Sequence, residues 1–177
     1  MEYPVRPAQS RRRPPPAPGF IDMLHVALFE PEIPPNTGNI ARLCAATACP
    51  LHLIGRLGFR IDDKSVRRAG LDYWDAVELH RHDDLAELEE FLKCIPSSPR
   101  IFCLSAHATM PYTEIPFQPG DCLLFGAETR GLPPEVLERF RAHTFTIPMV
   151  SGKVRSLNLA TAAGIVLYEG LRQLHAW

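Results

Sequence analysis

Short apolar runs alternate with longer helical segments from Met23 onward, and this alternation constrains the fold more than any other feature. The runs are three to six residues long and apolar at nearly every position, which suits strands covered on both faces. Strands that alternate with helices form a mainly parallel sheet with crossover helices. The expected strands are Leu24–Phe29, Leu51–Ile54, Ile101–Leu104, Cys122–Phe125 and Phe145–Ile147, and the expected helices are Thr37–Ala48, Leu85–Cys94, Pro134–Phe140 and Leu157–His175. The sequence therefore predicts one α/β domain over residues 23–177.

Residues 1–22 have a different composition, rich in proline and arginine. Proline blocks regular backbone hydrogen bonding, and adjacent arginines repel one another, so this segment cannot build a packed core. It also lacks the apolar stretch of a secretory signal. We expect a flexible tail without a function of its own. One alternative is an arm that adds affinity for a nucleic acid; the other is that the true start of the chain is Met23 and residues 1–22 result from a wrongly assigned start.

A formal net charge of −1 argues against a chain coated in basic residues for bulk nucleic-acid binding. Contact with a polyanion would have to come from a local patch. One short stretch is rich in cations: Arg56, Arg60, Lys64, Arg67 and Arg68. Such a cluster is either a solvated face or a phosphate-binding surface, and charge alone does not decide between them.

The five cysteines are scattered and form no Cys-x-x-Cys pair. This pattern favours neither a metal site nor a disulfide framework. A reducing cytoplasm fits it best. No apolar run approaches the roughly 20 residues that a membrane-spanning helix needs, so no membrane association is expected.

The first chemistry-bearing segment follows the first expected strand and spans residues 30–42. Asn36 or Thr37 can cap the next helix by accepting hydrogen bonds from its free backbone N–H groups. Arg42 would then lie about one and a half turns into that helix, near a positive helix end suited to phosphate. An ordinary helix cap with a surface arginine is the plain alternative.

The second segment, residues 123–133, leads from a buried strand into a loop with two glycines. Gly126 would allow a flat ligand such as adenine to approach the backbone, at the strand end where α/β proteins bind ligands. Glu128 at that exit could face a ribose hydroxyl, a cationic centre or a partner arginine. The stretch lacks the Gly-x-Gly-x-x-Gly fingerprint, so a nicotinamide site is not supported. A structural turn is the alternative.

The third segment, residues 147–162, ends a strand at Pro148 and passes through a polar loop into the last helix. Ser156 or Asn158 opens that helix, where side-chain oxygens and free N–H groups can hold a carboxylate or phosphate. The helix itself carries almost no charge before Glu169, which predicts burial against its own sheet and against another subunit. Tyr168 and Leu171 are the residues expected at that subunit contact.

In order and spacing, the three segments resemble the signature of the SPOUT methyltransferases. The resemblance covers residues 23 to about 174, nearly the whole expected domain. The stretches 28–39 and 67–73 narrow it to the bacterial tRNA (cytidine/uridine-34)-2′-O-methyltransferases, one-domain enzymes that act at the wobble ribose. The residues that carry the signature are Asn36 with Arg42, the stretch Phe125–Leu132 and the stretch Ile147–Leu159.

The resemblance implies a sheet whose C-terminal third is tied in a trefoil knot. The knot loops would hold S-adenosylmethionine in a bent shape, largely through main-chain groups. Such proteins act on the anticodon loop of tRNA, need no metal, and work as homodimers with the first and last helices at the interface. Matched by motif, the donor-binding residues are Leu104, Gly126, Ile147, Ser156 and Leu157.

The reaction implied is an in-line transfer of a methyl group from a sulfonium to a ribose 2′-oxygen. The family assigns proton abstraction or hydroxyl positioning to the counterpart of Arg42, but arginine stays protonated in proteins and is a poor base. We expect Arg42 to stabilise the developing alkoxide or an adjacent phosphate. The general base stays open between water and a substrate phosphate. The residues expected to orient Arg42 and the substrate are Asn36, Glu128, Ser156 and Asn158.

Two other functions stay open on the same fold. One is a non-catalytic RNA-binding or assembly factor, which the intact set of catalytic candidates disfavours. The other is a 2′-O-methyltransferase of ribosomal RNA, which the lack of a separate RNA-binding domain disfavours. The tRNA isoacceptors read by the chain are not predicted.

Overall fold

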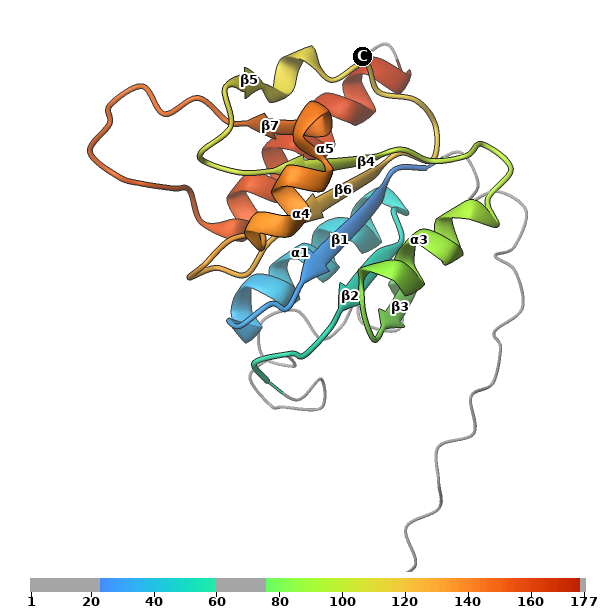
Figure 1. Cartoon of the computed structure of the whole chain (residues 1–177). Coiled ribbons are helices and arrows are strands. Elements are labelled where there is room, and N and C mark those ends of the chain that lie inside the picture. Colours follow the sequence, from blue (N-terminus) through green and yellow to red (C-terminus); the bar gives the residue numbers. More distant parts are fainter. Residues whose placement is uncertain (1–22, 60–75, 176–177) are drawn as a thin grey trace, which may run out of the picture.

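A seven-stranded sheet organises the chain, in the order β3-β2-β1-β6-β4-β7-β5, with every pair of neighbours parallel (Figure 1). The structure is a computed structural model that describes residues 23–59 and 76–175. The predicted α/β fold with a mainly parallel sheet is confirmed. The strands are β1 (His25–Phe29), β2 (Leu51–Ile54), β3 (Leu79–His82), β4 (Ile101–Leu104), β5 (Met110–Pro111), β6 (Cys122–Phe125) and β7 (Thr144–Thr146). The helices are α1 (Pro34–Thr47), α3 (Leu85–Lys93), α4 (Pro134–Arg139), α5 (Leu159–His175) and the short 3-10 helices η2 (Tyr112–Glu114) and η3 (Arg141–His143).

Helices cover both faces of the sheet, which explains why its central strands are apolar at nearly every position. On β1, Val26 and Leu28 belong to one buried cluster, while Ala27 between them belongs to another. The first cluster contains side chains of α1 and α5, and the second contains side chains of α3 and α4. The alternation of side chains along each strand therefore builds two cores from one short sequence.

Two strands lie outside the predicted set. The β3 sequence, Leu-His-Arg-His, has no apolar run because β3 is the edge strand next to β2. At the other edge, β5 has only two residues. The rule that selects buried central strands misses edge strands of this kind, since one side of an edge strand has no strand neighbour and tolerates polar residues.

Several sequence predictions fall on residues outside the described ranges. These are the tail of residues 1–22, the stretch 67–73, and all cations of the predicted cluster except Arg56. The trefoil knot also stays a prediction, although the sheet does place β6, β4 and β7 side by side. Within the described ranges, no helix combines the length and the apolarity needed to cross a membrane.

Three histidines form a hydrogen-bonded chain across strands β1, β2 and β3. His25 Nδ1 lies 2.8 Å from His52 Nε2, and His52 Nδ1 lies 2.9 Å from His82 Nε2. The ring of Phe91 from α3 contacts all three, and each histidine is buried. Burial and the nearby His80 lower the pKa of His25 to about 4, and burial also lowers the pKa of His52 and of His82. The folded chain thus keeps these rings neutral.

Acid should therefore weaken the fold before the carboxylates titrate. Below about pH 6.5 these histidines bind a proton in the unfolded chain but stay neutral in the folded chain. Their contribution to the free energy of unfolding is therefore fully present above about pH 6.5 and is lost as the pH falls toward 4. For His25 alone the shift corresponds to about 3 kcal/mol. We expect His25→Gln to flatten the fall of the urea midpoint between pH 7 and 4.5, and the exposed His107→Gln to leave it unchanged. An equally steep fall in His25→Gln would contradict this role.

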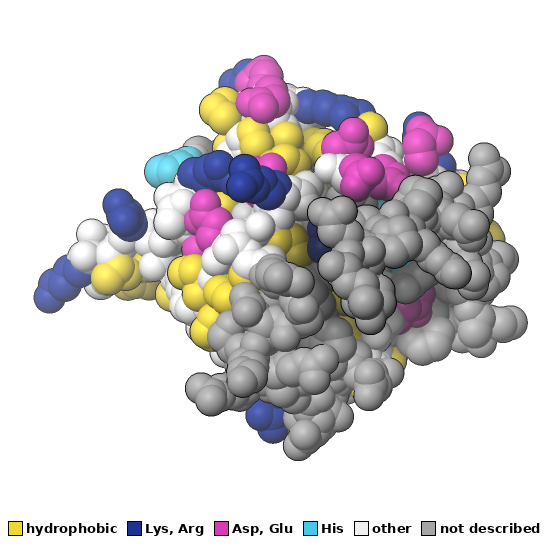
Figure 2. All heavy atoms as spheres, turned by 90° about the horizontal axis from the view of Figure 1, so that it is seen from below, with side chains coloured by type: hydrophobic (Ala, Val, Ile, Leu, Met, Phe, Trp, Pro, Cys, Tyr) yellow, Lys and Arg dark blue, Asp and Glu magenta, His cyan; other side chains and the backbone are white. Residues whose placement is uncertain are grey.

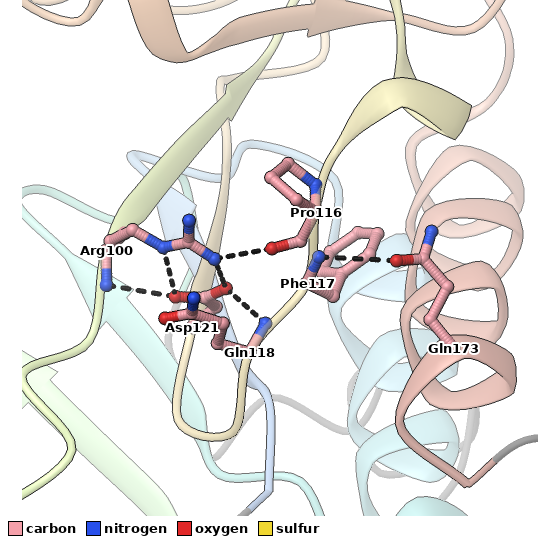
Figure 3. Close-up of polar contacts among 6 residues, drawn as sticks. All are labelled: Arg100, Pro116, Phe117, Gln118, Asp121 and Gln173. Atoms are coloured by element: carbon pink, nitrogen blue, oxygen red, sulfur yellow. Dashed lines mark hydrogen bonds and ion pairs between the residues drawn. The ribbon is translucent and has the colours of Figure 1, made fainter.

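An ion pair between the partly buried Arg100 and the buried Asp121 joins the starts of β4 and β6, at the edge of the sheet opposite the loops that follow these strands (Figure 3). Arg100 donates from its backbone N and Nε to Oδ1 of Asp121, at 3.1 Å each, and from Nη2 to Oδ2 at 2.7 Å. Arg100 Nη2 also donates to the Pro116 carbonyl, and the backbone N–H of Gln118 donates to Asp121 Oδ2. Asp121 is 1% exposed. The pair therefore holds the segment that precedes β6 against the start of β4.

Candidate active site

A cavity of about 660 Å³ lies at the carboxyl ends of the strands, where the loops after β4, β6 and β7 meet α1. This is the edge at which parallel α/β sheets bind ligands. Its volume falls within the range of small-molecule sites, which is about 300–1,000 Å³. The lining residues are Ile33, Asn36, Leu137, Ile147, Met149, Ala162 and the stretches 104–107, 125–132 and 155–159.

The structure gathers nearly all of the predicted site residues around this cavity. All five predicted donor-binding residues line it. Of the predicted catalytic residues, Asn36, Glu128, Ser156 and Asn158 line it, whereas Arg42 does not. Arg42 is exposed on α1. The cavity and Arg42 are therefore separate features of the described chain.

Hydrogen bonds join residues of the three sequence segments into one relay. The carboxylate of Glu128 accepts from the backbone N–H groups of Glu32 at 2.8 Å and Ile33 at 3.2 Å, and from Nδ2 of Asn36 at 3.0 Å. Oδ1 of Asn36 then accepts from Nδ2 of Asn158 at 2.8 Å. Because Asn36 both donates and accepts, its amide orientation is determined by its neighbours. Glu128 already receives three N–H groups, so positioning Asn36 is the role that its contacts support.

A second set of hydrogen bonds joins the same two segments with the roles of donor and acceptor exchanged. The sequence did not predict it. The Glu32 carboxylate accepts from the hydroxyl of Thr129 at 2.6 Å and from its backbone N–H at 3.2 Å. The bond from that hydroxyl lowers the pKa of Glu32 below its usual range. Glu128 and Glu32 thus bind each other's segments reciprocally. The only signal in the sequence was the presence of acidic residues in two segments that both follow an expected strand.

Asn158 caps α5, as one of the two predicted alternatives states. Its Oδ1 accepts from the N–H groups of Ala160 at 2.9 Å and Thr161 at 3.3 Å. Ser156 lies two residues earlier, in the exposed loop before the helix. One side chain therefore starts α5 and, through its Nδ2, reaches the relay.

The start of α1 differs from the prediction. The helix begins at Pro34, and neither Asn36 nor Thr37 caps it; the N-cap position is Ile33, which makes no side-chain hydrogen bond. Prolines at the first two helical positions lack N–H groups, so this end leaves fewer donors to satisfy. Arg42 lies eight residues beyond Pro34, more than two turns in, and not close to a positive helix end as predicted.

Gly126 is required by its own loop. An added Cβ would lie 2.1 Å from the carbonyl carbon of Gly131 and 2.2 Å from the backbone N of Leu132. The loop folds back through a 2.8 Å bond from the Gly131 N–H to the Ala127 carbonyl. Backbone, and not the predicted ligand, therefore occupies the space beside the Gly126 α-carbon. The glycine still lines the cavity.

The cavity combines apolar walls with a few polar groups at one side. Leu104, Phe125, Ile147 and Leu157 supply apolar surface, and the relay supplies amide and carboxylate groups. Such a mixture suits a ligand with a flat apolar part and a polar chain, such as a nucleoside derivative. Among the residues that the structure describes, no group of three or more His, Cys, Asp or Glu side chains is arranged to hold a metal ion.

Comparison with known proteins identifies close relatives of this chain. It is 48% identical over 154 residues to a tRNA (cytidine(34)-2′-O)-methyltransferase of Yersinia pestis, covering 86% of this chain and 94% of that protein. It is 47% identical over 153 residues to the protein of the same name from Escherichia coli K12, with the same coverage of both chains.

Solved structures agree with these relatives. A structure described by the words "Structural insights into the 2-OH methylation of C/U34 on tRNA" superposes with a TM-score of 0.80 at 50% identity, covering 89% of this chain and 99% of that one. The SpoU methyltransferase AviRb from Streptomyces viridochromogenes, in complex with AdoMet, superposes with a TM-score of 0.73 at 28% identity, covering 86% and 58%. The SpoU rRNA Methylase family matches residues 23–168, most of the chain. The chain belongs to the SpoU rRNA Methylase family.

Proposed function

We propose that the chain transfers a methyl group from S-adenosylmethionine to the ribose 2′-oxygen of nucleotide 34, the wobble position, of tRNA. The observation that carries the proposal is the relay of Asn36, Glu128 and Asn158 at the edge of a nucleoside-sized cavity. The relatives named for this reaction match at 47–48% identity over 94% of their length. The target nucleotide is either cytidine or a modified uridine.

The cavity is the proposed site of the methyl donor. AviRb, a member of the same fold, is known in complex with AdoMet. When bound, S-adenosylmethionine supplies an activated methyl group, so the protein has to provide binding, alignment and charge stabilisation. We assign donor binding to the backbone around Leu104, Gly126 and Ile147 and to Ser156 and Leu157, all of which line the cavity.

We assign the remaining steps of the reaction to residues that would act on the ribose, which accepts the methyl group. Arg42 would stabilise negative charge that develops on the ribose oxygen, or an adjacent phosphate. Asn36, which its two hydrogen bonds hold in place, would orient the acceptor with Ser156 and Asn158. Glu128 would keep Asn36 in position. Alignment of this kind contributes about 7–11 kcal/mol to barrier lowering, more than a general base does.

A methyl-transfer assay separates the proposed function from its two rivals. Tritium from labelled S-adenosylmethionine should enter bulk tRNA that lacks the modification, and not ribosomal RNA. Label in ribosomal RNA alone would favour the 2′-O-methyltransferase of ribosomal RNA, an alternative that draws support from the family description. No label in either RNA, with intact RNA binding, would favour a non-catalytic factor.

We also propose that the chain acts in the cytoplasm as a homodimer. The outer face of α5 would form the contact between the two subunits. That face carries residues at helical spacing, Thr161, Gly164, Ile165 and Tyr168. Tyr168 is 48% exposed, and a Cβ added at Gly164 would meet no other segment of the described chain within 4 Å. Leu171, predicted at the same contact, is instead 2% exposed and belongs to the core of its own chain. A charge at Leu171 would unfold the chain and cannot test the contact.

Tyr168→Arg should convert the dimer to a monomer, since an unpaired charge is costly to bury between subunits. The matched control is Ala86→Arg, which adds the same charge to an exposed position of α3. Light scattering at micromolar concentration measures the mass, and circular dichroism checks the fold. The proposal fails if the unmodified chain is itself monomeric, or if Tyr168→Arg stays dimeric.

A further inference from the structure

Among the described residues, three side chains that carry a formal charge line the cavity, and two of them have partners of opposite charge or hydrogen-bond donors. Glu128 receives its three N–H groups. Arg130 pairs with Glu30, at 2.6 Å from Nη2 to Oε2, and lies 3.9 Å from Glu32. Arg155 also lines the cavity but has no hydrogen bond or ion pair with any residue in the described ranges. One uncompensated cation thus remains at the cavity.

The segment that carries Arg155 is unusually open to solvent. The connection between β7 and α5 extends away from the body of the molecule (Figure 1). Basic and apolar side chains lie along the projection that it forms at the left of Figure 2. Val150 is 102% exposed and Val154 is 56% exposed, and Lys153 and Arg155 are exposed as well. A large ligand can therefore reach Arg155 from outside, while the next residue, Ser156, lines the cavity.

We infer that Arg155 binds a backbone phosphate of the substrate RNA at the mouth of the cavity, next to the nucleotide being methylated. This inference rests on the proposed function and adds a substrate-positioning residue to it. A guanidinium can donate two parallel hydrogen bonds to a phosphate. Arg155 is preferred to Arg130 for this contact because the charge of Arg130 is already neutralised by Glu30.

The carboxylate of the methyl donor is the other anion that enters such a site. The donor as a whole is cationic, because its sulfonium and ammonium outweigh one carboxylate. A nearby arginine therefore gains less from the donor than from an RNA chain, which carries one negative charge per nucleotide. The exposure of Arg155 also favours the larger ligand.

The test compares Arg155→Gln and Arg155→Lys with Lys153→Gln. Lys153 is the matched control because it is an exposed cation on the same loop and does not line the cavity. We expect Arg155→Gln to raise KM for tRNA at least about tenfold, because it removes charge-assisted hydrogen bonds to the phosphate, with donor affinity by calorimetry unchanged. The slope of log affinity for tRNA against log salt should fall by about one. Arg155→Lys should recover the slope but only part of KM, and Lys153→Gln should change KM less than twofold.

Each other outcome has a definite meaning. Weaker donor binding in Arg155→Gln with an unchanged KM for tRNA would assign Arg155 to the donor carboxylate and overturn the inference. Equal losses in Lys153→Gln and Arg155→Gln would reduce the effect to the general charge of the loop and also overturn it. If the unmodified chain methylates tRNA and Arg155→Gln matches it in KM and salt slope, the inference fails while the proposed function stands. If the unmodified chain does not methylate tRNA, the proposed function itself is wrong.

Discussion

Arg42→Ala is expected to lower the rate of methyl transfer by about a hundred- to a thousandfold, the loss that follows removal of one donor to a developing oxyanion. Donor affinity should stay near normal, because Arg42 does not line the cavity of its own chain. Arg42→Lys should recover little, since lysine keeps the charge but lacks the planar fork. Single-turnover assays give the rate, and calorimetry gives the donor affinity.

The control for this variant is Arg139→Ala, which removes an exposed arginine of α4 that is paired with Glu89. It should retain full activity. If folded Arg42→Ala loses donor binding, Arg42 belongs to the donor site and the proposed division of roles is wrong. If it methylates tRNA at the normal rate, Arg42 has no part in the reaction.

Asp121→Ala should lower the free energy of unfolding by about 3 kcal/mol, the lower end of the loss for a broken buried pair, because Arg100 loses its partner but is only partly buried. That is a large part of the roughly 5–15 kcal/mol that stabilises a typical domain. Glu89→Gln is the matched control: Arg139 Nη2 lies 2.7 Å from Glu89, as Arg100 Nη2 lies 2.7 Å from Asp121. The two pairs differ in the exposure of their side chains: 58% for Arg139 and 17% for Glu89, against 29% for Arg100 and 2% for Asp121.

At equal distance, burial should decide the difference between these pairs. A pair exposed to solvent contributes at most about 1 kcal/mol, so Glu89→Gln should shift the urea midpoint only slightly. Similar shifts in the two variants would contradict the role assigned to the Arg100–Asp121 pair. Both variants keep every residue that lines the cavity, so loss of activity in Asp121→Ala should follow loss of folded protein.

The central strands could be predicted from the sequence because a strand that is buried on both faces is a short run of apolar residues. It missed β3 because an edge strand of histidines and arginine carries no such run. His82 of β3 is buried by partners that no local pattern reveals, His52 on the next strand and Phe91 on α3. Contacts between distant segments decide these cases.

The site shows the same limit at the level of single residues. Asn36, Glu128 and Asn158 were predicted as a group, but not that they bond to one another across separations of 92 and 122 residues. Gly126 was predicted for its missing side chain, yet the backbone of Gly131 occupies that space. A motif identifies the residue type that is needed; the folded loop determines the reason.

The most direct test of the proposed function is to map the methylated nucleotide. Unmodified tRNA would be incubated with the purified chain and S-adenosylmethionine, digested with a nuclease, and analysed by mass spectrometry. We predict a gain of one methyl group on the ribose of nucleotide 34 and resistance of the adjoining phosphodiester to alkali, since alkaline cleavage needs a free 2′-hydroxyl. A methyl group on a base, or on a ribose outside the anticodon loop, would contradict the proposed function.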